Sequence, residues 1–294
     1  EARSTDVGHR DLDGRQRGSH ALQWRSSSRR TRVDGNREER VAAARAVELR
    51  HMREVCLIVP CYNEEGRLRR ETFLEFVRAR PQASLCLVDD GSSDGTLKAL
   101  EALRVEGGTR IIVQTLSKNS GKAEAVRQGV LYAASLERYG FLGYWDADLS
   151  TPLSQVDLLL AALEADPKRM LALGSRVKRL GSDIDRRATR HYLGRVFSTM
   201  ASQLFDLPVY DSQCGAKLFR SQMAGPLFGG PFVTKWLFDV ELLVRLRRHL
   251  GQSEFLDAAI EVPLTAWKEM GGSKLRLSHM LRVPIDLLRI RSRG

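Results

Sequence analysis

The stretch Phe141-Leu-Gly-Tyr-Trp-Asp-Ala-Asp148 is the segment of this 294-residue sequence that indicates the fold most directly. Its apolar run predicts a buried strand, and two aspartates, Asp146 and Asp148, follow at the end of that strand. Side chains two positions apart in extended backbone point to the same side, so both carboxylates can face one site. Two neighbouring negative charges are unfavourable unless a positive charge lies between them, and a hard divalent cation with oxygen ligands is the simplest one. An isolated Asp-x-Asp pair is more often a loop or capping feature, so the rest of the chain has to support this interpretation.

Two earlier segments repeat the same pattern of an apolar strand followed by a polar, turn-forming cluster. They are Val55-Cys-Leu-Ile-Val-Pro-Cys-Tyr-Asn-Glu64 and Leu85-Cys-Leu-Val-Asp-Asp-Gly-Ser-Ser-Asp94. We expect strands over residues 55–60, 84–88, 110–114, 141–145, 170–174 and 255–262. We expect helices between them near residues 66–79, 94–104, 121–137 and 153–165. This alternation predicts an α/β fold with a mostly parallel sheet flanked by helices on both faces. Ligands of such sheets bind beyond the carboxyl ends of the strands, where the polar clusters fall.

The remaining segments suggest how the chain is divided. Residues 1–51 are predicted to form a disordered or poorly ordered basic segment, residues 52–275 the α/β domain, and residues 276–294 a basic amphipathic helix. Helices are also expected over 187–205, 235–250 and 274–293, and Pro284 should kink the last one or split it in two. A basic amphipathic helix can dock on the domain or lie in a lipid interface, and the sequence leaves both possibilities open.

Composition limits the classes of function. The formal net charge of +11 suits nucleic acid, anionic lipid or phosphorylated substrates. Nucleic acid is disfavoured, because aromatic platforms and zinc-ligand spacing are lacking and acidic strand ends would repel a phosphate backbone. The four cysteines form no Cys-x-x-Cys pair, which argues against zinc and favours a reducing, cytoplasmic compartment. No apolar run approaches the ~18–20 residues of a membrane helix, so any membrane association is expected to be peripheral, at the cytoplasmic face.

Taken together, the motifs resemble the family-2 glycosyltransferases of the GT-A fold. The matching motifs are Pro60-Cys-Tyr-Asn-Glu64, Val88-Asp-Asp-Gly-Ser-Ser-Asp-Gly-Thr96, Asn119-Ser-Gly-Lys-Ala-Glu-Ala-Val-Arg-Gln-Gly129 and Asp146-Ala-Asp148. Later segments are similar to the dolichyl-phosphate β-glucosyltransferase branch, namely 174–176, 211–219, 236–243 and 267–275. The resemblance implies an inverting enzyme that moves a hexose, expected to be glucose, from a UDP-sugar to a polyprenyl or dolichyl phosphate with Mg²⁺ or Mn²⁺. A membrane surface is the expected place of action.

The resemblance also implies a role for each motif residue. Asp146 and Asp148 are expected to bind the metal ion and to act in catalysis with Arg176. The nucleotide-sugar side is expected to comprise Pro60, Tyr62, Asn63, Glu64, Asp89, Asp90, Lys118, Lys122 and Arg127. The acceptor-phosphate side is expected to comprise Arg187, Arg190, Gln213, Lys217, Asp239 and Glu241. Two pairs have simpler explanations, since Asp89 and Asp90 could cap the following helix, and Asp239 and Glu241 could be favoured by a helix dipole.

Departures from the family pattern leave alternatives open. Mannosyl relatives have Gln where this chain has Ser150, which leans towards glucose; Ala123 and Ala216 replace a frequent Gly and Phe. The eukaryotic branch usually carries an N-terminal membrane anchor, and this sequence has none. The alternatives are a dolichyl-phosphate mannosyltransferase-like enzyme using GDP-mannose and a non-catalytic nucleotide-sugar-binding protein. A phosphohydrolase is disfavoured, because its aspartate pair should follow the first strand of the domain and here it follows the fourth.

Overall fold

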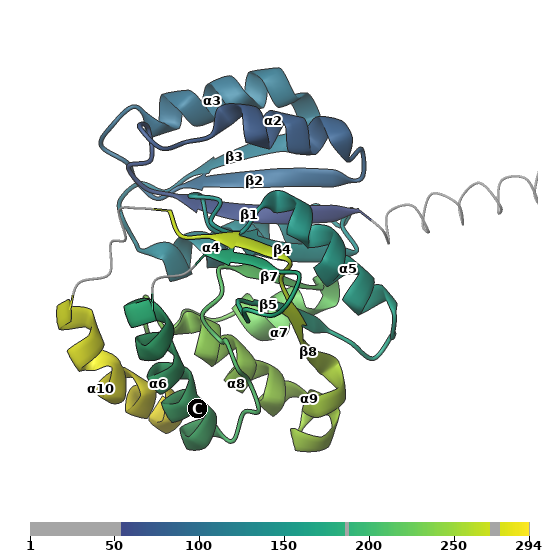
Figure 1. Ribbon diagram of the computed structural model, residues 1–294. Helices are drawn as coiled ribbons and strands as arrows, with labels where there is room; N and C mark the ends of the chain where they lie inside the picture. Colours follow the sequence, from purple (N-terminus) through teal and green to yellow (C-terminus); the bar gives the residue numbers. More distant parts are fainter. Residues whose placement is uncertain (1–53, 186–187, 271–276, 294) are drawn as a thin grey trace, which may run out of the picture. The chain divides into compact units, whose positions relative to one another are not determined.

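The computed structural model describes residues 54–185, 188–270 and 277–293, all within one unit that spans residues 44–294. The central sheet has the strand order β3-β2-β1-β4-β7-β5-β8 (Figure 1). Its strands are β1 (Val55–Cys61), β2 (Ala83–Asp89), β3 (Ile111–Thr115), β4 (Phe141–Trp145), β5 (Leu171–Ser175), β7 (Ala216–Arg220) and β8 (Ala259–Pro263). Neighbouring strands are parallel except at β7, which runs antiparallel to both β4 and β5. A small parallel pair joins β6 (Asp183–Asp185) to β9 (Ala266–Lys268).

Helices cover both faces of the central sheet. They are α2 (Arg70–Ala79), α3 (Thr96–Gly107), α4 (Lys122–Ser135), α5 (Val156–Glu164), α6 (Ala188–Phe205), α7 (Ala224–Phe228), α8 (Phe238–Leu250), α9 (Gln252–Ala258) and α10 (Leu277–Arg293). Short 3₁₀ turns occupy Gly108–Arg110, Leu153–Gln155 and Ser221–Met223. Successive strand side chains point to opposite faces, so in β1 Cys56 and Ile58 join the core under α4, α7 and α8, whereas Leu57 and Val59 join the core under α2, α3 and α5. The predicted α/β architecture is confirmed.

The strand register brings the polar clusters to one edge of the sheet. Cys61 of β1 pairs with Asp89 of β2, and β4 lies parallel to β1 on its other side. β7 enters the sheet from this same edge, because it is antiparallel and its first residue, Ala216, pairs with Trp145 at the end of β4. The loops after β1, β2, β4 and β5 therefore meet the segment that leads into β7.

Three local predictions differ from the structure. Residues 252–258 form helix α9 instead of the start of a strand, because Phe255 and Ala258 are buried three positions apart, which is a helical spacing. β7 was not anticipated as a strand. α10 continues through Pro284 as one helix and is not split there. The predicted segment 1–51 lies outside the described residues. Among those described, no helix combines the length and apolarity needed to cross a bilayer.

Candidate functional site

The two aspartates after β4 lie in a tight, hydrogen-bonded turn. The Asp146 N–H donates to the carbonyl of Gly215 at 3.0 Å, and the Leu149 N–H donates to the Asp146 carbonyl at 3.1 Å. Leu149 has a φ of 53°, which reverses the chain. Oδ1 of Asp148 accepts the Ser150 N–H at 2.9 Å, which fixes that carboxylate. Both aspartates remain half-buried, so their orientation is set by the backbone while their free oxygens stay accessible.

Asp146 has a basic neighbour at the start of α4. The Lys122 ammonium lies 2.5 Å from Oδ1 of Asp146. Burial by itself lowers the pKa of Lys122, but the negative charges of Asp146, Asp239 and Asp148 outweigh burial and the pKa is raised. Lys122 is therefore a firmly charged ammonium ion directly beside one of the predicted metal ligands.

The donor groups present fit a magnesium-like ion that shares its coordination with a substrate. The described residues hold no cluster of three or more His, Cys, Asp or Glu side chains arranged for a metal, so a complete protein cage is not present there. Asp146 and Asp148 supply carboxylate oxygens at one edge of the sheet. Mg²⁺ is commonly held by one or two carboxylates, with substrate phosphates and water completing its octahedron. A metal bound together with a diphosphate is therefore the arrangement that these residues suit.

The loops after β1 and β2 are hydrogen-bonded to each other on the predicted nucleotide side. Oδ1 of Asn63 accepts the Ser93 N–H at 2.9 Å, and the Asn63 N–H donates to Oγ of Ser92 at 3.0 Å. The Glu64 N–H donates to Oγ1 of Thr96 at 2.8 Å. Asn63 has a φ of 50°, a conformation that Asn tolerates better than most residues. The amide of Asn63 thus builds the wall of this loop pair.

Asp90 connects β2 to the start of α4. Its carboxylate accepts the Ser120 N–H at 2.7 Å and the Gly121 N–H at 2.8 Å. Burial raises the pKa of Asp90 despite these hydrogen bonds and the nearby Lys235. Asp89 is also buried and accepts the Ser92 N–H at 3.3 Å.

Helix α3, which follows these two aspartates, is not capped by either of them. Its first residue, Thr96, donates its N–H to Asp94 at 3.0 Å. Asp90 instead holds the loop before α4, about thirty residues further along the chain. The capping alternative thus applies to a different helix from the one expected.

The other residues predicted on the nucleotide side are more dispersed. Glu64 pairs with Arg67 at 2.7 Å. Tyr62 is half-buried in the loop after β1, Pro60 lies within β1, and Lys118 is exposed in the loop before α4. In a list of their own, the contacts of Arg127 are Nε and Nη2 to Glu124, each at 2.8 Å, and Nη1 to the Phe228 carbonyl at 3.5 Å. Arg127 therefore already has an anionic partner on its own helix.

Arg176, directly after β5, is held rigidly by Asp211. Nε and Nη2 of Arg176 each donate to the Asp211 carboxylate at 2.7 Å, a bidentate ion pair. The guanidinium also lies 5.5 Å from the ring centroid of Trp267. Burial opposes the charge, but Asp211 outweighs it and raises the pKa of Arg176, with a further contribution from Asp146. Arg176 is thus a fixed positive charge within electrostatic range of the Asp146 carboxylate.

Three buried polar atoms around this ion pair lack hydrogen-bond partners within the described part of the chain. They are Oγ of Ser175, Oγ of Ser212 and Nε2 of Gln213. An unsatisfied buried polar group costs about 1–3 kcal/mol, so three of them beside Arg176 suggest a place that a ligand would complete. Gln213 was predicted from its motif. Ser175 and Ser212 were missed, and only their isolation in the folded chain identifies them.

Lys217 and Asp239 form a buried ion pair beneath the site. Nζ of Lys217 lies 2.6 Å from Oδ1 of Asp239 and donates to the Cys214 carbonyl at 2.7 Å. Tyr144 Oη donates to the same carboxylate oxygen, and burial followed by the charge of Asp239 raises the Tyr144 pKa well above 10. Lys217 is fully buried. These residues support the floor of the site, and their predicted contact with an acceptor remains a prediction.

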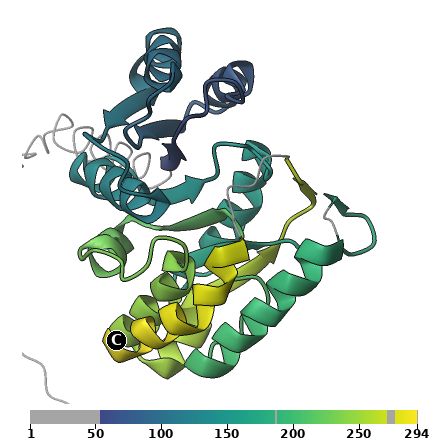
Figure 2. The same ribbon diagram turned by 90° about the vertical axis from the view of Figure 1, so that its left-hand side faces the viewer.

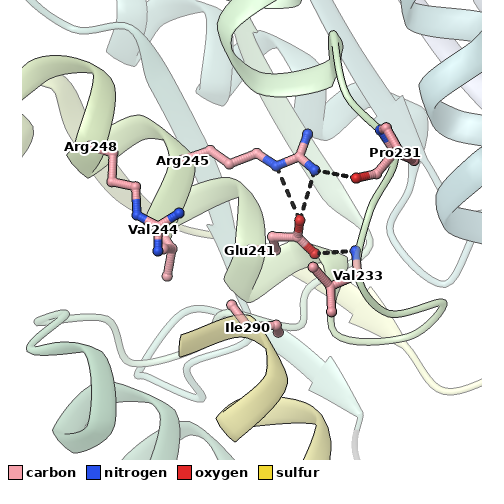
Figure 3. Close-up of a pocket in the computed structure, with 7 residues that line it drawn as sticks. All are labelled: Pro231, Val233, Glu241, Val244, Arg245, Arg248 and Ile290. Carbon is pink, nitrogen blue, oxygen red and sulfur yellow. Dashed lines mark hydrogen bonds and ion pairs between the residues drawn. The ribbon is translucent and has the colours of Figure 1, made fainter. Parts of the chain in front are cut away.

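Glu241 holds a neighbouring loop. Its carboxylate accepts the Val233 N–H at 2.8 Å and pairs with Arg245 at 2.7 Å, and Arg245 also donates to the Pro231 carbonyl (Figure 3). These contacts border a hollow of about 220 Å³ into which Arg248 projects. Glu241 therefore orders residues 230–237. Arg187 and the side chain of Arg190 lie outside the described part of the chain.

Comparison with known proteins agrees with this architecture. The family model "Glycosyl transferase family 2" matches residues 56–228. The chain belongs to glycosyl transferase family 2. It is similar to the human dolichyl-phosphate beta-glucosyltransferase, at 34% identity over 82% of this chain and 76% of that protein. The Trichomonas vaginalis dolichyl-phosphate beta-glucosyltransferase ALG5D is 32% identical over 80% of this chain and 72% of its own length.

Solved structures of glycosyltransferases share the fold. Mannosyl-3-phosphoglycerate synthase from Rubrobacter xylanophilus superposes with a TM-score of 0.62 at 16% identity, covering 85% of this chain and 77% of that one. Glucosyl-3-phosphoglycerate synthase from Mycobacterium tuberculosis, in complex with Mn²⁺, uridine diphosphate and its product, gives 0.58 at 19% identity, covering 81% and 80%. The present glycosyltransferase therefore has the GT-A fold, as the sequence predicted.

Proposed function

We propose that this glycosyltransferase moves glucose from UDP-glucose to a dolichyl or polyprenyl phosphate, with Mg²⁺ or Mn²⁺ held by Asp146 and Asp148. The observation that carries the proposal is the opposition of charge at one sheet edge. The aspartate pair suits a metal diphosphate, and the fixed guanidinium of Arg176 suits a phosphate. Relatives that share about a third of this sequence are named dolichyl-phosphate beta-glucosyltransferases. A structural neighbour was solved with Mn²⁺ and UDP-glucose, which supports the donor and the ion.

The proposed reaction needs no general base from this chain. A phosphate monoester has its second pKa near 6, so the acceptor oxygen is already negative at neutral pH. That oxygen attacks the anomeric carbon, the bond from this carbon to the diphosphate oxygen breaks, and UDP leaves with the electron pair. In-line displacement inverts the anomeric centre and gives a β-linked product from an α-linked donor. A metal ion on the aspartates would act as a Lewis acid towards the leaving diphosphate.

The task of the protein is then to bring two anions together. Arg176 would offset the charge of the acceptor phosphate, and Asp211 with Trp267 keeps the guanidinium in place before the acceptor arrives. The unsatisfied atoms of Ser212 and Gln213 lie in the same segment as Asp211 and would satisfy sugar hydroxyls or phosphate oxygens. Arg187 and Arg190 remain proposed helpers on this side.

The two faces of α10 support attachment to a membrane surface. Leu287 and Ile290 are buried against the domain, beside α6 (Figure 2). Ile285 and Leu288 point outward and are 54% and 58% exposed, next to the basic Arg289 and Arg291, which line the same shallow hollow. A basic helix with outward apolar side chains suits an anionic lipid interface. The helix thus docks on the domain with one face and leaves the other for lipid, where the acceptor would be found.

A donor screen tests the proposed reaction. The purified full chain is incubated with labelled UDP-glucose, other UDP-sugars or GDP-mannose, dolichyl phosphate and Mn²⁺ or Mg²⁺, with and without chelator. We expect lipid-linked glucose from UDP-glucose in the presence of metal only. Preferential transfer from GDP-mannose would support the mannosyltransferase alternative. Binding of UDP-sugars without transfer to any acceptor would indicate a nucleotide-sugar-binding protein.

Vesicle co-sedimentation tests the lipid face. The double variant Ile285→Ser/Leu288→Ser should bind vesicles containing anionic lipid more weakly than the wild type does. Leu256→Ser is the matched control, because Leu256 is a similarly exposed leucine, at 52%, on α9. Equal loss in both variants, or in neither, would argue against a lipid interface on α10. Truncating α10 is a poorer test, since it would uncover the core around Leu287 and Ile290.

A further inference from the structure

Lys122 occupies a position that the metal ion would need to share. Its Nζ lies 2.5 Å from Oδ1 of Asp146, an oxygen that the proposed function assigns to the metal. Its charge is also sensed by Asp148, the second proposed ligand. An ammonium ion and a divalent cation so close to one carboxylate would repel each other strongly, because interactions inside a protein are screened less than in water.

The other ion pairs of the site have settled partners. Arg176 is paired in bidentate fashion with Asp211, and Lys217 is buried against Asp239. Neither cation can change partner without leaving a buried carboxylate unpaired, which is costly. Lys122 differs, because it is only half-buried and its described ion-pair partner is the half-buried Asp146. It is therefore the cation of this group that can exchange its partner most easily.

We propose that Lys122 is a positioning residue that holds the Asp146 carboxylate when no metal is bound and turns to the donor diphosphate when metal and nucleotide bind together. This inference rests on the proposed function. The flexible four-carbon stem of a lysine lets its ammonium move while the backbone stays in place. Lys122 is also the first residue of α4, a helix end that favours anions.

The exchange makes binding of metal and nucleotide interdependent. Free metal has to displace an ammonium ion from Asp146 and then tolerates that charge nearby. A metal–diphosphate complex supplies two negative charges with which the displaced ammonium can pair. Lys122 therefore opposes binding of the metal alone and favours binding of the metal–nucleotide complex, which is the opposite of a residue that merely adds positive charge to a phosphate site.

Mn²⁺ binding followed by the electron paramagnetic resonance of free Mn²⁺ tests the inference without turnover. The full-length wild type, Lys122→Met, Lys122→Arg and Lys235→Met are titrated with Mn²⁺ alone and then with Mn²⁺ plus UDP. For Lys122→Met we expect about tenfold tighter Mn²⁺ binding and at least about tenfold weaker UDP binding, the size of one lost charge interaction. Lys122→Arg keeps the charge and should bind Mn²⁺ alone as the wild type does.

Lys235→Met is the matched control. The Lys235 stem lies close to Gly121, at the same helix end, with its Cδ 3.1 Å from where a β-carbon on Gly121 would be. Removing this charge should leave the affinity for Mn²⁺ alone within about twofold, because the effect of an exposed charge is strongly screened. A thermal melt confirms that each variant is folded; if Lys122→Met is not, Lys122→Gln replaces it.

The outcomes separate this inference from the proposed function. Unchanged or weaker Mn²⁺ binding in folded Lys122→Met, with wild-type UDP–Mn²⁺ binding intact, would overturn the exchange and leave the proposed function standing. Failure of the wild type to bind UDP in the presence of Mn²⁺ would overturn both. Equal tightening of Mn²⁺ binding in Lys235→Met would show a general charge effect and would also overturn the exchange.

Discussion

A β-carbon on residue 215 would stand 1.9 Å from Oδ2 of Asp146, so these two residues can be neighbours only because residue 215 is glycine. The carbonyl of Gly215 also accepts the Asp146 N–H. The contact depends on the antiparallel entry of β7, which brings the residue before Ala216 alongside the end of β4. The carboxylate at the centre of the site thus rests on bare backbone.

Gly215→Ala should therefore push the Asp146 carboxylate aside. We expect metal-dependent UDP-sugar affinity to fall by at least about tenfold, with a stability loss of about 1–3 kcal/mol from overpacking. Calorimetry and urea unfolding measure the two quantities. Gly225→Ala is the control, since a β-carbon there meets nothing within 4 Å, and it should leave both unchanged. Wild-type donor affinity in Gly215→Ala would contradict the placement of Asp146.

Asp148→Asn should remove most turnover while preserving the fold. The substitution keeps the shape and the hydrogen bond from the Ser150 N–H but removes the charge that would bind the metal. Loss of one such electrostatic group typically costs about 10²–10³ in turnover. The comparison is Asp157→Asn in α5, a surface aspartate paired with Arg80, which should leave the rate unchanged. A fully active Asp148→Asn enzyme would refute the metal assignment.

The buried pair beneath the site predicts a marked stability effect. Lys217→Met leaves the Asp239 carboxylate buried without its cation, which typically costs about 3–5 kcal/mol. The double variant Lys217→Met/Asp239→Asn removes the unpaired charge and keeps an acceptor for Tyr144, so it should regain much of the loss. Urea denaturation gives both free energies. A double variant no more stable than the single one would argue that the charge pair is not the cause.

Buried thiols predict a loss of stability at alkaline pH. Burial raises the pKa of Cys214 to about 11 and that of Cys86 to about 12, above the ordinary value of 9.0. Above pH 9 the unfolded chain releases these protons before the folded chain does, so the free energy of unfolding falls as pH rises towards 11. Below pH 8 these groups should contribute no pH dependence. Chemical denaturation between pH 7 and pH 10.5 measures the slope, and Cys214→Ala should make it shallower.

The sequence was informative wherever a structural cause is local. Apolar runs that end in polar clusters marked β1, β2 and β4, and the parallel order of these strands made the convergence of their ends predictable. Partners that are distant in the sequence were not predictable. Asp90 caps the entry to α4 about thirty residues away, and Arg176 pairs with Asp211 thirty-five residues away. These partners are set by tertiary packing, which leaves no periodic signal.

The same limit explains why a charged motif residue can be part of the support of a site. Lys217 and Glu241 both lie in motifs that resemble the glucosyltransferase branch, yet Lys217 is fully buried and Glu241 holds the loop at Val233. A motif reports that a side chain is needed, and only the fold shows what it contacts. The conformation of β7, which brings Gly215 to Asp146, was likewise visible only in the structure.

Calorimetric titration of UDP-glucose into the full-length protein tests the central claim most directly. The account predicts measurable binding with Mn²⁺ or Mg²⁺ present, its loss when a chelator removes the ion, and no metal-dependent binding in Asp148→Asn. Equal affinity with and without the chelator would contradict the assignment of Asp146 and Asp148 as the residues that hold the donor diphosphate through a metal ion.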